Sequence, residues 1–571
     1  MPRTTLPLIV GGLLLALSAA PFVPTIAAQT VSTDDVDAIF AEWDRPDSPG
    51  CALAVIHKGE IVYKNGYGSA SLEHGVPITP STVFYSGSVS RQFVALSIAL
   101  LAEQGKLSFD DDIRAYLPEI PEYDRTITVR HLIHHTSGLR DYLQLGFLAG
   151  RSYLDSMAEE EVLALIARQD ALNFSPGGQY LYSNSGYFLL AQIVERASGQ
   201  TLREYTDEHV LGPLGMADSH FHDDNTMVVP RRADGYFRQD DGSWGVMTMR
   251  FALVGSGGLY TTVEDLVRWD QNFYHNTLGA GAQTLIDTTL TRGILASGDT
   301  LNYAFALGVG SYRGLKTVGH GGSLGGFRAN LVRFPEHQFA TAILCNLANV
   351  NPGALANRVA DLYLADVLAP TASASEPETE AEARTVATVD PAIYDDYHGK
   401  YADALGLVIG IAREGERLIL DWPGYDAIEL FPESETMFFQ HIDEDRFAFH
   451  REASGEVAGL TVHRGARRIH FTRIPAWTAD ELAAYAGAYH SDELQVTYTI
   501  ALNDGDLTLR IQSNPPSELS VTRQDNASAE VGSMTFERDD HGAVTGFVLQ
   551  SGRVRNLRFV LQPQMDADEH R

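Results

Sequence analysis

A serine and an arginine stand three residues apart in the stretch Ser-Val-Ser-Arg, at Ser88 and Arg91, where a loop gives way to an apolar helical pattern. On a helix this spacing puts two side chains on the same face, within reach of each other. A serine nucleophile needs a proton acceptor at such a distance, and arginine does not supply one, because its guanidinium keeps its proton in proteins. Serine is also a common helix cap, so the stretch taken alone favours a cap over a nucleophile.

Tyr182 and Asn184 form the second candidate group, directly before a predicted helix over 187–197. A phenol beside positive charge can act as a general base, and an amide can hold a substrate carbonyl. A tyrosine and an asparagine two residues apart carry little information in isolation. The pair becomes a stronger candidate for a catalytic group because it follows a candidate nucleophile in the sequence.

The third group is His320, Gly321, Gly322 and Ser323, which lead into a predicted strand over 327–334. Glycines there let a substrate lie close to the backbone, and a histidine can change charge near neutral pH. The same residues match the Gly-x-Ser-x-Gly pattern of another hydrolase class. That pattern requires a helix after the serine, and here a strand follows, so we set it aside.

In this order the three groups resemble the motifs of the serine β-lactamase and penicillin-binding protein superfamily. The nearest branch is the class C β-lactamase-like one, with its D-aminopeptidases, esterases and DD-peptidases. The resemblance covers about residues 35–367, and the phrases at 128–139, 211–216 and 255–262 also fit it. It implies an α+β fold in which an antiparallel sheet packs against helices.

The resemblance also implies a role for each candidate residue. Ser88 would be the acylated nucleophile, Tyr182 the base or proton shuttle, and Asn184 an organiser of hydrogen bonds to the substrate. His320 takes the place of the lysine in the family's Lys-Thr-Gly motif. The backbone N–H groups of Ser88 and Ser323 would form the oxyanion hole. The implied protein is an exported serine hydrolase acting on D-amino peptides, muropeptides or esters, and poorly on β-lactams.

Arg91 departs from the family pattern, which has lysine at this position. A mechanism that needs a neutral lysine is therefore excluded, but the positive charge is kept, and a fixed cation favours a phenolate. Our hypothesis is that Tyr182 alone serves as the base, with Arg91 and His320 holding its phenolate. The alternative is a catalytically silent envelope binding protein.

The elements around these motifs predict how the motifs are positioned. Alternating and apolar runs predict a hairpin over 52–63, strands over 327–334 and 339–347, and a helix over 355–368. Strands at both ends of a domain, with helices between them, predict one sheet closed by the two ends of the domain.

Two further modules are expected after this domain. Residues 369–390 lack aromatic and large aliphatic side chains, so we interpret them as a linker. Beyond it, a Tyr-x-Gly-x-Tyr pattern at Tyr397 recurs at Tyr485, among short strands separated by turns. The repeat predicts two small all-β modules over 391–475 and 476–571, each a closed or nearly closed antiparallel barrel. Their role stays open.

The N-terminus has a positive start, a short apolar run and small residues up to Ala28. These features predict a signal peptide over 1–28, with an uncleaved anchor as the alternative, and a periplasmic or secreted protein. The hydrolase domain would then span 29–368.

The formal net charge is -32, from 74 acidic and 42 basic residues, which argues against nucleic acid as a partner. We expect small peptide, ester or cell-wall-derived substrates and no metal or cofactor. Five histidines are of a type that binds metals, but no carboxylate stands at a zinc spacing from them. They are His131, His134, His135, His220 and His222.

Cys51 and Cys345 are the two cysteines, and each lies in an apolar, strand-like run. We interpret them as buried free thiols. A disulfide joining the two ends of one sheet is the alternative that export would allow.

Overall fold

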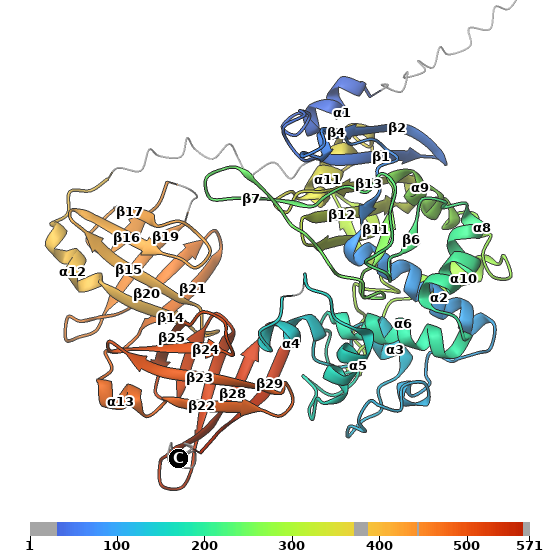
Figure 1. Cartoon of the computed structure of the whole chain (residues 1–571). Helices are drawn as coiled ribbons and strands as arrows, with labels where there is room; N and C mark the ends of the chain where they lie inside the picture. Colours follow the sequence, from blue (N-terminus) through green and yellow to red (C-terminus); the bar gives the residue numbers. More distant parts are fainter. Residues whose placement is uncertain (1–30, 153, 371–385, 442–444, 564–571) are drawn as a thin grey trace, which may run out of the picture.

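The computed structural model describes residues 31–152, 154–370, 386–441 and 445–563. The chain forms an α+β domain followed by two closed barrels (Figure 1), so the predicted fold class is confirmed. The expected signal peptide lies outside the described residues. Within the described ranges, no helix is long and apolar enough to cross a membrane.

The α+β domain is built on a six-stranded antiparallel sheet in the order β10-β11-β12-β13-β1-β2. As predicted, strands from the two ends of the domain, β1 and β13, lie side by side within it. The strands are β1 (Cys51–His57), β2 (Glu60–Tyr67), β10 (Gly308–Tyr312), β11 (Leu315–Leu324), β12 (Phe327–Phe334) and β13 (Phe339–Cys345). Three small sheets of the described residues lie outside this sheet: the pair β3 (Ser69–Ser71) and β4 (Val76–Pro77), the pair β7 (Tyr236–Arg238) and β8 (Trp244–Val246), and a three-stranded sheet in the order β5 (Phe84–Tyr85), β9 (Leu259–Thr261), β6 (His220–Phe221).

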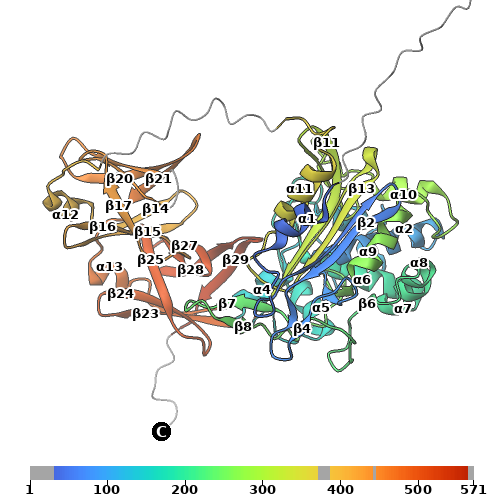
Figure 2. The ribbon, with the colours of Figure 1, turned by 90° about the horizontal axis from the view of Figure 1, so that it is seen from above.

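Helices cover both faces of the sheet (Figure 2). On one face α1 (Thr33–Phe40) and α11 (Pro352–Tyr363) pack over the side chains of alternate β1 residues. On the other face lies the larger core, which contains α2 (Arg91–Glu103), α6 (Asn184–Ser198) and α9 (Val263–Asn272). The remaining helices are α3 (Val129–Ile133), α4 (Tyr142–Leu148), α5 (Glu159–Ala167), α7 (Leu202–Thr206), α8 (Gly212–Leu214) and α10 (Gln283–Thr289).

Local sequence explains where the elements next to the motifs begin and end. The β1–β2 hairpin turns at Lys58 and Gly59, both with positive φ, as a two-residue turn between twisted strands requires. Helix α6 begins earlier than predicted because the Ser183 hydroxyl accepts a hydrogen bond from Gly186 N. It ends at Gly199, whose φ of 80° is a left-handed helix stop.

The interpretation of the two cysteines as free thiols is wrong. Cys51 and Cys345 form a disulfide between β1 and β13, where the two residues lie directly opposite each other in the register. Both are fully buried. The sequence gives two apolar strands but not their register, and the register decides whether two cysteines face each other.

The two barrels each contain eight antiparallel strands. Barrel 1 consists of β14 (Gly399–Asp403), β15 (Val408–Glu414), β16 (Arg417–Asp421), β17 (Ile428–Pro432), β18 (Met437–Phe439), β19 (Arg446–Arg451), β20 (Val457–Arg464) and β21 (Arg467–Arg473). Barrel 2 consists of β22 (Gly487–Ser491), β23 (Val496–Asn503), β24 (Asp506–Ile511), β25 (Ser517–Arg523), β26 (Asn526–Ala529), β27 (Gly532–Arg538), β28 (Val544–Ser551) and β29 (Val554–Leu561). Short helices α12 (Tyr394–Tyr397) and α13 (Ala479–Ala483) precede them.

The tyrosines of the sequence repeat make the same contact in both barrels. The Tyr401 hydroxyl donates to the Tyr397 carbonyl at 2.8 Å, and the Tyr489 hydroxyl donates to the Tyr485 carbonyl at 2.8 Å. Each contact ties the first strand of a barrel to the last turn of the helical segment before it, at Tyr397 in α12 and at Tyr485 just after α13. The repeat therefore marks the same structural position twice.

Barrel 2 packs directly against the α+β domain. Its apolar core continues into α4 and α5 through Leu145, Leu148 and Leu165. The Tyr498 hydroxyl donates to the Leu148 carbonyl at 2.7 Å. Figures 1 and 2 both show β29 beside α4. The last hairpin of the chain consequently lies next to the predicted site.

Candidate active site

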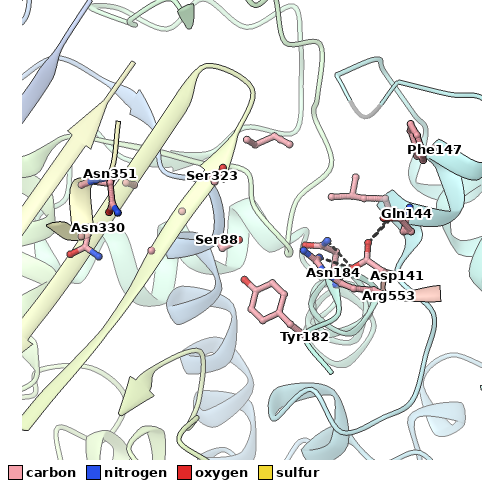
Figure 3. A pocket seen from close by; sticks show the side chains of 17 residues that line it. Ser88, Asp141, Gln144, Phe147, Tyr182, Asn184, Ser323, Asn330, Asn351 and Arg553 are labelled. Atoms are coloured by element: carbon pink, nitrogen blue, oxygen red, sulfur yellow. Dashed lines mark hydrogen bonds and ion pairs between the residues drawn. The ribbon is translucent and has the colours of Figure 1, made fainter. Parts of the chain in front are cut away.

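One cavity of about 760 Å³ lies between β11, the start of α6 and the loop before α2 (Figure 3). Arg91 and His320 lie behind this cavity rather than on its wall, in contact with the Tyr182 ring. Six of the eight predicted residues line it: Ser88, Tyr182, Asn184, Gly321, Gly322 and Ser323.

Ser88 lies on a short 3₁₀ turn, Gly87–Ser90, ahead of α2, and not on the predicted helix itself. Two glycines bring this turn against β11. A Cβ at Gly87 would lie 2.6 Å from Ser323 N, and a Cβ at Gly322 would lie 3.1 Å from Ser88 N. The N–H groups of Ser88 and Ser323 are thus held close together, as two donors to one oxyanion must be.

Arg91 is fully buried and stacks on the candidate base. Its Cζ lies 4.3 Å from the centre of the Tyr182 ring, and its Nε donates to the Ser256 carbonyl at 2.9 Å. Burial alone would lower the pKa of Arg91, but the neighbouring tyrosines and Asp141 outweigh burial and raise it. Arg91 therefore stays a cation, which favours negative charge on the phenol it covers.

Asn184 is held in one orientation by partners of opposite kind. Its Oδ1 accepts a hydrogen bond from Arg91 Nη2, and its Nδ2 donates to Asp141 Oδ2 at 2.8 Å. An acceptor facing the guanidinium and a donor facing the carboxylate fix which end of the amide is which. Among the described residues, Asp141 is the acceptor that Nδ2 meets.

His320 belongs to a chain of hydrogen bonds behind Tyr182. Ser183 N donates to His135 Nδ1 at 3.1 Å, so a neutral His135 carries its proton on Nε2. Nε2 lies 3.1 Å from the Tyr303 hydroxyl, which lies 3.1 Å from His320 Nε2. The Tyr303 hydroxyl then donates to His320, and His320 Nδ1 donates to the Gly321 carbonyl at 2.5 Å.

The two histidines of this chain are neutral near pH 7. Burial, reinforced by the charge of Arg91, lowers the pKa of His320 to about 4 and that of His135 well below its ordinary value. This differs from the expectation that His320 changes charge near neutral pH. The positive charge beside Tyr182 comes instead from Arg91 and from a residue that the sequence did not point to, Arg553.

Asp141, Gln144, Phe147 and Arg553 also line the cavity and were not predicted (Figure 3). Asp141 precedes α4, and its side chain accepts the N–H groups that begin this helix. The sequence signal at Asp141 is therefore that of an ordinary helix cap. Arg553 lies in the turn between β28 and β29, and no local pattern connects it to residues more than 400 positions earlier.

Arg140 fixes barrel 2 beside the cavity. Its guanidinium is fully buried and pairs with Glu493, whose side chain is 8% exposed. It also donates to the Arg555 carbonyl at 2.9 Å and to the Asn556 carbonyl at 2.7 Å. Because these carbonyls follow the β28–β29 turn directly, the same side chain that binds the barrel also sets the position of Arg553.

The fold, the paired N–H groups at Ser88 and the tyrosine over a buried cation define a serine hydrolase of the β-lactamase type. The model of the β-lactamase family matches residues 36–366, which is more than half of the chain, and the chain belongs to this family. A domain family of unknown function matches residues 383–473, which include every strand of barrel 1.

The individual proteins that the chain resembles share less than a third of its residues. The chain is 29% identical over 397 residues to a penicillin-binding protein of Bacillus subtilis (strain 168), covering 67% of this chain and 85% of that protein. It is 24% identical over 538 residues to a D-aminopeptidase of Brucella anthropi, covering 90% and 95%. An octameric penicillin-binding protein homologue from Pyrococcus abyssi has the same fold, with a TM-score of 0.54 at 24% identity, covering 76% of this chain and 98% of that one.

Proposed function

We propose that the protein hydrolyses amide or ester substrates through an acyl-enzyme on Ser88. The observation that carries this proposal is the convergence of Ser88, Tyr182 and Asn184 on one cavity, with the Ser323 N–H beside that of Ser88. Ser88 and Tyr182 face the same space in Figure 3.

The residues divide the reaction into two steps. The Ser88 hydroxyl attacks the substrate carbonyl while the Tyr182 phenolate takes the hydroxyl proton, and two backbone N–H groups hold the oxyanion. Tyr182 then gives this proton to the leaving nitrogen or oxygen. In the second step Tyr182 takes a proton from the water that attacks the ester carbonyl, and gives this proton to Ser88 Oγ as the bond between Oγ and the acyl carbon breaks, which regenerates the phenolate.

Arg91 has a defined part in this scheme. It keeps its proton throughout and stabilises the phenolate from behind the ring, at 4.3 Å from Cζ to the ring centre. Tyr182 is therefore the only group in this scheme that exchanges protons with Ser88.

The expected substrates are D-amino peptides, muropeptides and simple esters, with β-lactams as poor ones. The names of the relatives, a D-aminopeptidase and a penicillin-binding protein, support this class. We place the protein in the periplasm or outside the cell, because residues 1–28 have the pattern of a signal peptide. The disulfide between Cys51 and Cys345 supports an oxidising compartment.

The test is the intact mass of the protein after incubation with a fluorophosphonate and, separately, with a penicillin. We expect an adduct that Ser88→Ala abolishes and Tyr182→Phe reduces by at least about 100-fold in rate. Full acylation of Tyr182→Phe would contradict the assignment of the base. No adduct up to about pH 10, where a phenol ionises unaided, would favour the silent binding protein, as would activity gained only in Arg91→Lys.

A further inference from the structure

Arg553 brings a positive charge into the cavity from a different domain. It lies in the β28–β29 turn of barrel 2, lines the cavity wall and keeps 43% of its side chain exposed. Its Cζ lies 5.3 Å from the centre of the Tyr182 ring. Figure 3 shows it beside Asp141, at the opposite end of the cavity from Asn330 and Asn351.

Asp141 is the acidic residue on the cavity wall, and its oxygens are already occupied. Oδ1 accepts from the backbone of Leu143 and Gln144 at 3.1 and 3.2 Å. Oδ2 accepts from Asn184 N at 2.7 Å, from Asn184 Nδ2 at 2.8 Å and from Arg553 Nη1 at 3.2 Å. With its side chain 1% exposed, Asp141 anchors Arg553 and does not offer a free carboxylate to a substrate ammonium.

Arg553 is the charged side chain that the cavity presents to a substrate. Arg91 lies behind the wall and faces the Tyr182 phenolate of the proposed mechanism, and Asp141, the acidic residue among the described residues of the lining, is only 1% exposed. The Nε and Nη2 donors of Arg91 meet neutral acceptors, the Ser256 carbonyl and the Asn184 amide. The accessible charge on the wall is therefore positive, in a chain whose formal net charge is -32. Such a site attracts anionic substrates and disfavours cationic ones.

The position of Arg553 is fixed before any substrate arrives. Its carbonyl accepts from Asn173 Nδ2 at 2.9 Å, and Arg555 N donates to Asn173 Oδ1 at 2.8 Å. Gln144 Nε2 donates to the Ser551 hydroxyl at 2.9 Å on the other side of the turn. A turn held at both ends loses little conformational entropy when its arginine binds a ligand.

We propose that Arg553 is a specificity-determining residue that binds a carboxylate of the substrate. This inference rests on the proposed acyl-enzyme function and names its substrate class: peptides or esters that carry a carboxylate near the scissile bond. A peptidase that removes amino-terminal residues must instead accept an ammonium there. Among the described residues, the Arg553 guanidinium donates to Asp141 through Nη1, and its remaining N–H donors suit a carboxylate, which binds such a fork through two oxygens.

Two matched pairs of probes test the proposal. The first pair is p-nitrophenyl hydrogen glutarate and p-nitrophenyl pentanoate, which differ by a carboxylate on the acyl side. The second is N-acetyl-D-alanyl-D-alanine and its C-terminal amide, which differ on the leaving side. For each pair the ratio of kcat/KM, carboxylate over neutral, is measured in the wild type, Arg553→Gln, Arg553→Lys and Arg558→Gln.

We expect the ratio to fall about 10- to 100-fold in Arg553→Gln for at least one pair, which also identifies the side that carries the carboxylate. Arg553→Lys should restore part of it, because the charge remains. Arg558→Gln is the matched control, since Arg558 lies on β29 and pairs with Glu537 on the barrel surface. An unchanged ratio in both pairs would overturn the proposal.

Two further measurements separate this proposal from the proposed catalysis. Fluorophosphonate labelling of Ser88 in Arg553→Gln measures how far the loss of this charge slows the base, because the probe carries no carboxylate; such a loss is shared by both probes of a pair and cancels in their ratio. Calorimetric binding of the two dipeptides to Ser88→Ala reports carboxylate recognition without turnover. A preference that Arg553→Gln removes in this background would stand even if the wild type never acylates.

Discussion

The two barrels share a topology and an aromatic pattern, but their last hairpins meet different surroundings. In barrel 1 the β20–β21 turn carries Gly465 and Ala466, both exposed to solvent. In barrel 2 the equivalent β28–β29 turn carries Gly552 and Arg553, and Arg553 enters the cavity of the hydrolase domain. Both glycines have positive φ, 56° and 51°, so the first residue of each turn has the same left-handed conformation.

The residues that form a barrel are therefore different from the residues that place it beside the active-site cavity. Tyrosines at the first strand form the same hydrogen bond in both copies. The described core of barrel 1 consists of its own residues, whereas the core of barrel 2 includes Leu145 and Leu148 of α4. The repeat thus encodes the fold, and residues outside the repeat encode the docking and the contact with the site.

Removing the Arg140 side chain, which holds barrel 2 in place, should cause the largest loss of stability. Arg140→Ala leaves Glu493 buried without its cation, so the free energy of unfolding should fall by about 3–5 kcal/mol. Urea unfolding followed by tryptophan fluorescence measures this change. Hydrogen exchange over 551–556 should rise in the same variant, because the carbonyls that hold the turn lose their donor.

The matched control lies in barrel 1. Arg413 pairs with Asp395 at 2.6 Å, with side chains 30% and 66% exposed. Because exposed pairs contribute up to about 1 kcal/mol, Arg413→Ala should change little. Equal losses in Arg140→Ala and Arg413→Ala would contradict the view that barrel 2 alone is fixed by a buried pair.

The candidate catalytic motifs could be found in the sequence because their signals are local. Ser88 and Arg91 stand one helical turn apart, and Tyr182 and Asn184 directly precede a helix with a strong apolar pattern. The tyrosine repeat likewise predicts two barrels from short-range patterns. Each of these inferences needs only a few neighbouring residues.

The rest of the site depends on contacts between distant segments. Asp141 and Arg553 meet across 412 positions, and this meeting requires the docking of barrel 2 onto α4 and α5. The pairing of Cys51 with Cys345 depends on strand register, which apolar runs do not encode. His135 carries the signal of an ordinary loop histidine until Tyr303 is placed beside it.

Replacing the repeat tyrosines by phenylalanine should lower the free energy of unfolding by a smaller amount, and equally in the two barrels. Tyr401 and Tyr489 are fully buried, and each hydroxyl makes one hydrogen bond of 2.8 Å. Tyr401→Phe and Tyr489→Phe should each lower the free energy of unfolding of their own barrel by about 1–2 kcal/mol, because a buried carbonyl loses its partner. Hydrogen exchange of β14 and β22 reports the two barrels separately. A loss confined to one variant would show that the repeat is not energetically equivalent.

The smallest expected effect is at the contact between the barrels. Lys400 of barrel 1 pairs with Glu518 of barrel 2, with side chains 45% and 57% exposed. Partial burial alone would raise the pKa of Glu518, but hydrogen bonds from Lys400 and Ser520 outweigh it and lower this pKa. A carboxyl whose pKa is lower in the folded state stabilises the fold above its ordinary pKa of 4.5, and this contribution is lost as the pH falls through the folded value.

Glu518→Gln should therefore lower the free energy of unfolding at pH 7 by less than about 1 kcal/mol, seen as a slightly lower thermal midpoint. Near pH 3 the two proteins should unfold at the same temperature. Added salt at pH 7 should remove the difference as well, because the pair is exposed to solvent. A difference that persists in 1 M salt would contradict an exposed contact and would place the inter-barrel pair in the same class as Arg140 and Glu493. The contrast between one buried and one exposed attachment of barrel 2 would then no longer hold.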